Sequence, residues 1–223
     1  MPLNESKGNM YDFVNKTWNT VKGQCYHDCS YCYMKRWKNL KPARFDEKEL
    51  NIDLGSGNFI FVGSSNDLFA IENDYNWIYM TLYHCNKYPK NKYLFQTKIP
   101  EELFYWRNQL PINSVFCTTL ESNRWYHDHM GNSPSPYNRM LAMQRIKKDK
   151  YITIEPIMDF GLGAFVEMIR SINPIQVNIG ADSGNNNLPE PEWDKVEKLI
   201  EELQEFTTVK LKKNLDRLRK TNH

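Results

Sequence analysis

Seven short runs of apolar and β-branched residues recur along the chain. They are rich in Ile, Val, Phe and Thr, and most of them are bounded by Gly, Pro, Asn or Ser. Runs of this length and composition are typical of strands that are buried in a sheet. The predicted strands are residues 17–23, 58–63, 92–97, 114–119, 151–156, 174–180 and 207–212.

Between these runs lie segments whose apolar residues recur at helical spacing. Residues 67–87 begin at Asp67, a residue type that often caps helices, and Pro89 follows their end. Residues 137–148 and residues 190–205 also carry apolar stripes at this spacing. The sequence therefore predicts three helices at these positions.

Alternation of strands and helices predicts parallel strands that are joined by right-handed crossovers. Six or seven such units form a doubly wound sheet or an incomplete barrel, and a full eight-unit barrel needs about 250 residues. The chain has 223 residues, so we expect one α/β domain over 1–223, a partial (βα)6 TIM-like barrel with an optional seventh strand. The functional face of either fold lies at the carboxyl ends of the strands.

Composition places the chain among ordinary globular proteins. It has a net charge of +2 and is 25% charged and 40% hydrophobic, which is unlike a disordered tail. Its longest apolar stretches, such as residues 59–62, have the length of a strand and not that of a membrane span. Residues 1–6 lack the apolar core of a secretory signal. We expect a cytoplasmic protein that does not interact with a membrane.

The five cysteines are unevenly distributed. Cys25, Cys29 and Cys32 fall within eight residues, whereas Cys85 and Cys117 stand alone and are expected to pack in the core. A disulfide framework spreads its cysteines, so the clustered thiols indicate a metal site. Three thiolates at the spacing C-x3-C-x2-C can bind three irons of a [4Fe–4S] cluster. The fourth iron then remains open to a reactant.

The cysteine motif, with the aromatic Tyr31 just before its last cysteine, resembles that of the radical S-adenosylmethionine (SAM) superfamily. The resemblance implies one [4Fe–4S] cluster, SAM as cofactor and an external one-electron reductase of the flavodoxin or ferredoxin type. It also implies cleavage of SAM to methionine and a 5′-deoxyadenosyl radical, which abstracts a substrate hydrogen. The chain has no room for a domain that binds an auxiliary cluster, so we expect a reaction that uses a single cluster.

Further motifs follow the cysteines in one order over about residues 11–214. They are Trp18 and residues 61–69, 96–98, 118–121, 154–156, 178–184 and 209–212. Together with the cysteine motif they resemble a phage-associated radical SAM family of largely unassigned function. The superfamily usually has a Gly-Gly-Glu segment that receives the SAM ammonium group. This sequence lacks it, so Asp67 and nearby carbonyls are the candidates for that contact.

The resemblance implies roles for individual residues. Cys25, Cys29 and Cys32 would bind the cluster, and Arg139 would pair with the SAM carboxylate, which a guanidinium can bind bidentately. Lys98 and Lys212 would contact the substrate. The implied SAM-binding residues are Tyr31, Ser64, Ser65, Asn66, Asp67, Thr119, Glu121, Arg139, Glu155, Asn178, Gly180, Ala181 and Asp182.

Several residues have simpler interpretations. In these interpretations, Asp67 is an ordinary helix cap. Glu155 simply ends a strand before Pro156, and Arg139 is a solvated helix residue. His27 could complete a Cys3His zinc site with the three cysteines. The alternative function is therefore a non-catalytic iron–sulfur or zinc protein that acts as a sensor or adaptor.

The expected substrate follows from the resemblance and from basic residues. A nucleotide, base or nucleic acid comes first, on the basis of the phage resemblance, Lys98, Lys212 and the basic segment 210–220. A peptide or small metabolite comes second. Residues 124–136, which include His127 and His129, are predicted to form an exposed polar loop over the same face.

Overall fold

One eight-stranded sheet organises the part of the chain that the structure, a computed structural model, describes: residues 3–6 and 10–220. The strand order is β1-β2-β5-β6-β7-β8-β9-β10. From β2 to β10 every neighbouring pair is parallel, and only β1, among the described strands of this sheet, runs antiparallel to its neighbour. The strands are β1 (Asn4–Glu5), β2 (Lys16–Trp18), β5 (Phe59–Val62), β6 (Lys92–Thr97), β7 (Ser114–Thr119), β8 (Lys150–Ile154), β9 (Gln176–Ile179) and β10 (Thr208–Leu211).

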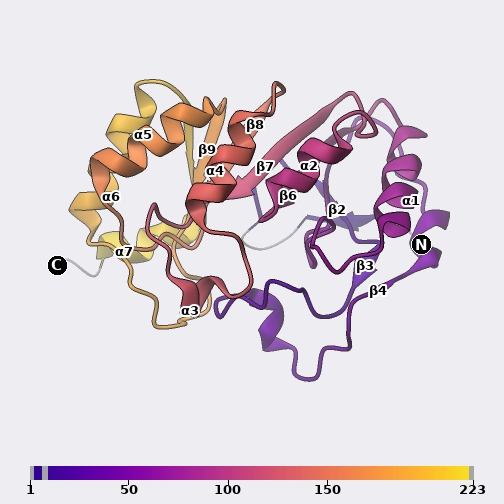
Figure 1. Ribbon diagram of the computed structural model, residues 1–223, viewed down its shortest axis with the longest axis horizontal. Coiled ribbons are helices and arrows are strands. Elements are labelled where there is room, and N and C mark those ends of the chain that lie inside the picture. Colours follow the sequence, from indigo (N-terminus) through magenta and orange to yellow (C-terminus); the bar gives the residue numbers. More distant parts are fainter. Residues whose placement is uncertain (1–2, 7–9, 221–223) are drawn as a thin grey trace.

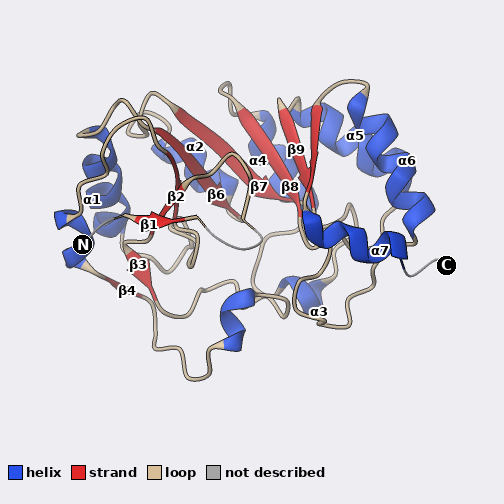
Figure 2. Cartoon of the chain, turned by 180° about the vertical axis from the view of Figure 1, so that it is seen from behind, coloured by secondary structure: helices blue, strands red, loops and turns tan. Residues whose placement is uncertain are grey.

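Helices cover the convex side of this sheet. Figure 2 shows the strands in front with α2, α4 and α5 behind them, and Figure 1 shows the same helices in front. The α-helices are α1 (Tyr75–Asn86), α2 (Pro100–Trp106), α3 (His127–Met130), α4 (Pro136–Gln144), α5 (Leu162–Ile172), α6 (Trp193–Gln204) and α7 (Asp216–Lys220). None of the described helices combines the length and the apolar character that crossing a bilayer requires. The predicted partial barrel is confirmed, and it has the seventh parallel strand.

The two faces of the curved sheet bury different side chains, because successive residues of a strand point to opposite sides. The larger core lies between the sheet and the helices. A second core on the concave side joins Tyr11 and Val14, which precede β2, to Leu94 and Cys117 of the strands. The N-terminal segment therefore fills part of the barrel interior. Cys117 is a buried core residue, as the sequence predicts.

The first predicted strand, residues 17–23, is wrong in its extent. β2 ends at Trp18, and residues Val21–Lys22 form a separate strand, β3. β3 pairs antiparallel with β4 (Arg44–Phe45) in a small two-stranded sheet. The apolar pattern is continuous across both strands, but it does not reveal that the chain changes its pairing partner at Asn19 and Thr20.

The predicted start of the first helix is also wrong. α1 begins at Tyr75, and the side chain of Asp74 caps it by accepting the backbone N–H of Asn76 at 2.8 Å. Asp67 lies seven residues earlier and caps no helix. The sequence prediction also lacks α2 and α5. α6 lies within its predicted segment, and α4 begins one residue before the segment predicted for it.

The cap on α1 gives a first testable expectation. Replacing Asp74 by Ala should lower the free energy of unfolding by about 1 kcal/mol, because an N–H of the first turn loses its acceptor. Urea denaturation would measure it. The matched control is Glu72→Ala on the same exposed segment, with an expected effect within about 0.5 kcal/mol. Equal effects of the two substitutions would contradict the capping role.

Candidate functional site

The cysteine loop runs from β3 to the short helix η1 (Tyr33–Arg36), next to the segment that follows β5. The side-chain amide of Asn66 donates to the carbonyls of Gly23 and Gln24, at 3.2 and 3.3 Å. Tyr33 Oη donates to the carbonyl of Ser64 at 2.9 Å. The predicted cluster ligands and part of the predicted SAM-binding segment are thus neighbours. Ser65 lies in that segment, with its N–H bonded to Asn19 Oδ1 at 2.9 Å.

Asp67 ties the cysteine loop to the end of β6. Its buried Oδ2 lies 2.8 Å from His27 Nε2 and accepts the Thr97 hydroxyl and the Lys98 N–H, each also at 2.8 Å. Burial alone would raise the pKa of Asp67, but the hydrogen bonds, led by that of His27, lower it below its usual value. Asp67 therefore holds two parts of the site together as a carboxylate.

A loop from the other side of the barrel covers the cysteine loop. The N–H of Ser30 donates to the carbonyl of His129 at 2.9 Å, and the N–H of Asn132 donates to that of His27 at 2.8 Å. The predicted loop 124–136 is therefore partly helical, as α3, and packs against the site. Between these contacts lies Gly131, at a φ of +57°, where a Cβ would lie 2.1 Å from the carbonyl oxygen of His27.

This close approach predicts a strong dependence on Gly131. Gly131→Ala should lower the free energy of unfolding by about 1 kcal/mol or more, because both the φ angle and the contact disfavour a side chain. It should also slow the uptake of iron. The matched control is Gly163→Ala in α5, where a Cβ meets nothing within 4 Å and the substitution should be neutral or stabilising by up to about 1 kcal/mol. Urea denaturation distinguishes them, and equal effects would argue against a close packing of the two loops.

The three candidate ligand thiols lie at different depths in the protein. Cys29 is buried, and Cys25 and Cys32 are half-buried. Burial, with a smaller effect of the Asp67 charge, raises the pKa of Cys25 to about 12, although the N–H groups of Asp67 and His27 oppose this rise. The Cys25 thiol is therefore protonated until a metal displaces its proton.

The alternative of one zinc ion lacks a preformed site. Among residues 3–6 and 10–220, no three Cys, His, Asp or Glu side chains are grouped closely enough to hold one metal ion. His27, the fourth ligand in that alternative, directs Nε2 to Asp67. A [4Fe–4S] cluster accepts its thiolates at separate irons, so the thiols need not converge on one point.

A buried charged network lies beside the cysteines. Glu121 at the end of β7 pairs with Arg139 of α4 at 2.9 Å and with Lys98, and it also accepts a hydrogen bond from Tyr31. Glu121 and Arg139 are 0% exposed. Burial would raise the pKa of Glu121, but Arg139 and Lys98 hold it well below its usual range.

Arg139 is held entirely inside the protein. Besides Glu121, its guanidinium donates to the carbonyls of Thr119 at 2.5 Å and Pro134 at 2.9 Å. The interpretation of Arg139 as a solvated helix residue is therefore wrong. The contact of Arg139 with the SAM carboxylate stays a prediction.

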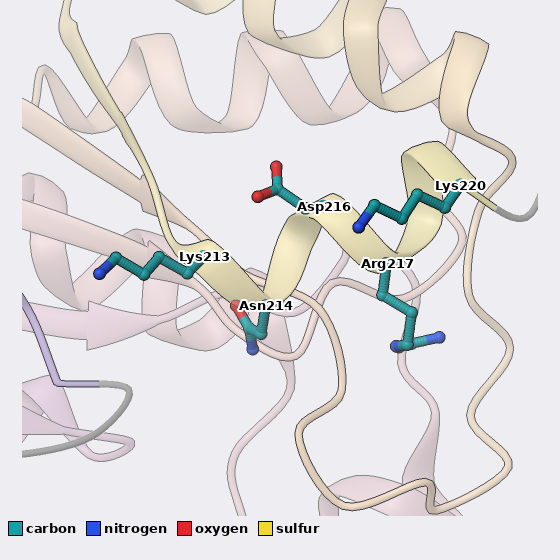
Figure 3. Close-up of a pocket in the computed structure, with 5 residues that line it drawn as sticks. All are labelled: Lys213, Asn214, Asp216, Arg217 and Lys220. Atoms are coloured by element: carbon teal, nitrogen blue, oxygen red, sulfur yellow. The ribbon is translucent and has the colours of Figure 1, made fainter.

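A second group of predicted residues surrounds Glu155. Its carboxylate pairs with Lys212 at 2.6 Å and accepts the side-chain amide of Asn214 at 3.2 Å. Asn214, which Figure 3 shows between Lys213 and Arg217, also donates to the carbonyl of Ala181 at 2.6 Å. A Cβ on Gly180 would lie 2.9 Å from Glu155 Oε1, so a side chain at this position would have to displace the Glu155 carboxylate.

The side chains of Asn178 and Asp182 bond to β9, to the neighbouring β8 and to the loop that follows β9. Asn178 Oδ1 accepts the side-chain amide of Gln176 at 2.8 Å. The carboxylate of Asp182 accepts the N–H groups of Gly184 at 2.9 Å and Asn186 at 2.5 Å. Asp182 therefore shapes the loop that follows β9.

Tyr11 joins the two groups across the concave face. Its hydroxyl donates to Gln96 at 2.8 Å and lies 2.5 Å from the Thr153 hydroxyl, while Lys212 Nζ lies 4.7 Å from the centre of its ring. Gln96 in turn donates to Thr119 at 3.2 Å. Sequence reasoning missed Tyr11 and Asn214. Asn214 lies just beyond the last predicted strand, which is a usable signal, but Tyr11 precedes the first predicted strand and carries none.

The parallel partial barrel matches known structures in fold. The chain resembles spore photoproduct lyase in fold. A cysteine-to-alanine mutant of that enzyme aligns with a TM-score of 0.67 and 13% identity, over 93% of this chain and 80% of the enzyme's chain. Another mutant structure of the enzyme contains bound AdoMet, which is SAM, and dinucleoside spore photoproduct. It aligns with a TM-score of 0.61 and 11% identity, over 89% of this chain.

The similarity to spore photoproduct lyase is structural and leaves part of the enzyme uncovered. A cysteine-to-serine mutant structure aligns with a TM-score of 0.62 and 14% identity. In this alignment the present chain spans 64% of the enzyme's length. No protein-family model and no curated protein sequence matches the chain. The resemblance to the phage-associated family thus stays a prediction.

Proposed function

We propose that the protein is a radical SAM enzyme with one [4Fe–4S] cluster bound by Cys25, Cys29 and Cys32. One observation carries the proposal: the three free cysteines lie on one loop at the end of a partial barrel that has the fold of spore photoproduct lyase, a radical SAM enzyme. When bound, such a cluster supplies the electron that cleaves SAM and generates the 5′-deoxyadenosyl radical.

The chain's own residues hold and shield this chemistry. Asp67 fixes the cysteine loop through His27 and fixes β6 through Thr97. Arg139 and Lys98 keep Glu121 ionised next to Tyr31, in a site that excludes water. We assign Arg139 a positioning role through Glu121 because its guanidinium is already engaged there.

The proposed SAM site lies between the two groups of polar residues. The cysteine side offers Tyr31, Ser64, Ser65, Asn66 and backbone carbonyls. The opposite side would receive the rest of the cofactor at five more of the residues that the resemblance implies, Glu155, Asn178, Gly180, Ala181 and Asp182. Thr119, which the resemblance also implies, lies between the two sides, bonded to Gln96 and to Arg139. The buried Oδ1 of Asn66 supports this proposal, since it has no hydrogen-bond partner among the described residues.

We further propose a nucleotide unit as the substrate. Lys98 and Lys212 contribute less to this inference than the sequence suggests, because both ammonium groups pair with buried or half-buried carboxylates. The support comes from the fold neighbour, one structure of which holds a dinucleoside spore photoproduct. Electrons would come from a one-electron reductase, and a peptide or small metabolite stays the second choice of substrate.

Equilibrium dialysis with labelled SAM tests the proposal. The anaerobically reconstituted protein should bind SAM, whereas the iron-free protein and the Cys29→Ala variant should bind it at least about tenfold more weakly, because the open iron is the main anchor. Equal binding with and without iron would contradict the proposal. A protein that incorporates zinc and ignores SAM would favour the sensor or adaptor alternative.

A further inference from the structure

The segment that follows the cysteines, residues 33–44, is strongly basic. We call it the basic arm. No Asp or Glu occurs between Asp28 and Asp46, and the arm contains five cations: Lys35, Arg36, Lys38, Lys41 and Arg44. In the described part of the chain, the ion pair found for the arm joins Lys35 to Asp28 at 2.8 Å, and both side chains are about half exposed. The arm thus presents a net positive surface.

Aromatic rings interleave with these cations. Tyr33 is 45% and Trp37 is 50% exposed. The Arg36 guanidinium lies 4.4 Å from the centre of the Trp37 ring and 5.2 Å from that of Tyr33, which are distances of cation–π contacts. The two rings meet edge to face, with their centres 6.1 Å apart and their planes at 74°. Neither ring belongs to the hydrophobic cores of the described residues, so their packing around Arg36 does not stabilise the barrel interior.

The arm begins inside the proposed site. Tyr33 directly follows Cys32, and its hydroxyl donates to the carbonyl of Ser64 in the proposed SAM segment. From there the arm passes through η1 to β4. In both views it is the outermost loop on the side of the molecule that carries α3, beyond the carboxyl ends of the strands (Figures 1 and 2). A ligand on the arm would therefore extend into the site.

We propose that the basic arm binds single-stranded nucleic acid that flanks the target nucleotide. The inference rests on the proposed function and specifies its substrate as a polymer. Phosphates would lie near the cations and a base would stack on Trp37, the combination that single-strand binding proteins use. An acidic protein, such as an electron donor, would need the charges alone and would leave the two exposed rings without a role.

Fluorescence anisotropy tests the inference with a labelled oligodeoxynucleotide of about 12 residues, the full-length reconstituted protein and two substitutions. Trp37→Ala should weaken binding about tenfold through the lost stacking. Arg36→Gln should reduce the slope of log K against log[salt], measured between about 50 and about 200 mM salt, by about 0.7. The matched controls are Tyr79→Ala on α1, where the ring is 53% exposed, and Lys198→Ala on α6, and both should bind like the wild type.

The same samples separate the two proposals. Weakened oligonucleotide binding by Trp37→Ala, with SAM binding unchanged, would support the arm. Equal loss in Trp37→Ala and Tyr79→Ala, or no loss in either, would overturn it. If polyglutamate displaced the labelled oligonucleotide as well as unlabelled oligonucleotide does at equal total charge, that result would also overturn the proposal, in favour of an acidic protein. Absence of SAM binding in the wild type would count against the proposed function alone, since the anisotropy still reports on the arm.

Discussion

Cys29→Ala should abolish the iron–sulfur cluster. We expect the variant to retain less than about a tenth of the wild-type iron and sulfide after anaerobic reconstitution, because two thiolates cannot hold a cluster that three thiolates bind. Cys29 is the most buried of the three cysteines, 4% exposed, and its sulfur lies 3.4 Å from the carbonyl of Met130. Iron and sulfide analysis, together with the visible absorption of the cluster, would measure the loss.

Cys85→Ala is the control for this substitution. Cys85 is buried in α1, in the core between the helices and the sheet, so its replacement costs some stability but removes no proposed ligand. It should keep the wild-type iron content. Full iron content in Cys29→Ala, or its loss in a folded Cys85→Ala protein, would show that the cluster is not bound by the cysteine loop.

Arg139→Ala should be among the most destabilising single substitutions in the chain. It leaves the carboxylate of Glu121 buried with Lys98 alone, and breaking a buried ion pair in this way costs about 3–5 kcal/mol. The control is Arg145→Ala, just beyond the end of α4, where the side chain is 50% exposed and pairs with Glu101; it should cost at most about 1 kcal/mol. Urea denaturation of the iron-free proteins measures both. Similar losses would mean that the buried network does not stabilise the fold.

The same network predicts an acid-sensitive stability. Glu121 has a lower pKa in the folded protein than the usual value of 4.5, so its contribution is fully present above about pH 4.5 and is lost as the pH falls toward the folded value. Glu121→Gln has no such group to titrate. We expect the stability of the wild type to fall more steeply below about pH 4.5 than that of the variant. Equal slopes in urea denaturation across this range would contradict the prediction.

The local pattern of apolar residues was sufficient to predict much of the fold. The strands β5 to β9 coincide with apolar runs because a strand buried on both faces needs apolar residues along most of its length. β10 also coincides with a predicted strand, although most of its residues are exposed. The apolar residues of α5, including Phe165, Val166 and Ile169, carry a helical spacing that could have identified this helix. The change of partner between β2 and β3 could not be predicted, because pairing depends on where Arg44–Phe45 lies in space.

The candidate site also has features that the sequence predicts and features that it does not. The cysteines are recognisable because their spacing is local, and the polar ends of the strands follow from the topology. The contacts within the site are not local. His27 meets Asp67 across 40 residues, and Tyr31 meets Glu121 across 90. Tyr11 lies in the barrel because an N-terminal segment fills the concave face, which no spacing in the sequence indicates.

The most direct test of the central claim is the fate of SAM in the reduced, reconstituted protein. The assay would quantify 5′-deoxyadenosine and methionine by chromatography, with and without an oligodeoxynucleotide of about 12 residues, in the wild type and in Cys29→Ala. We predict that both products form in the wild type in equal amounts and are absent from the variant. Intact SAM in a wild-type protein that holds its cluster and is supplied with the oligonucleotide would contradict the account.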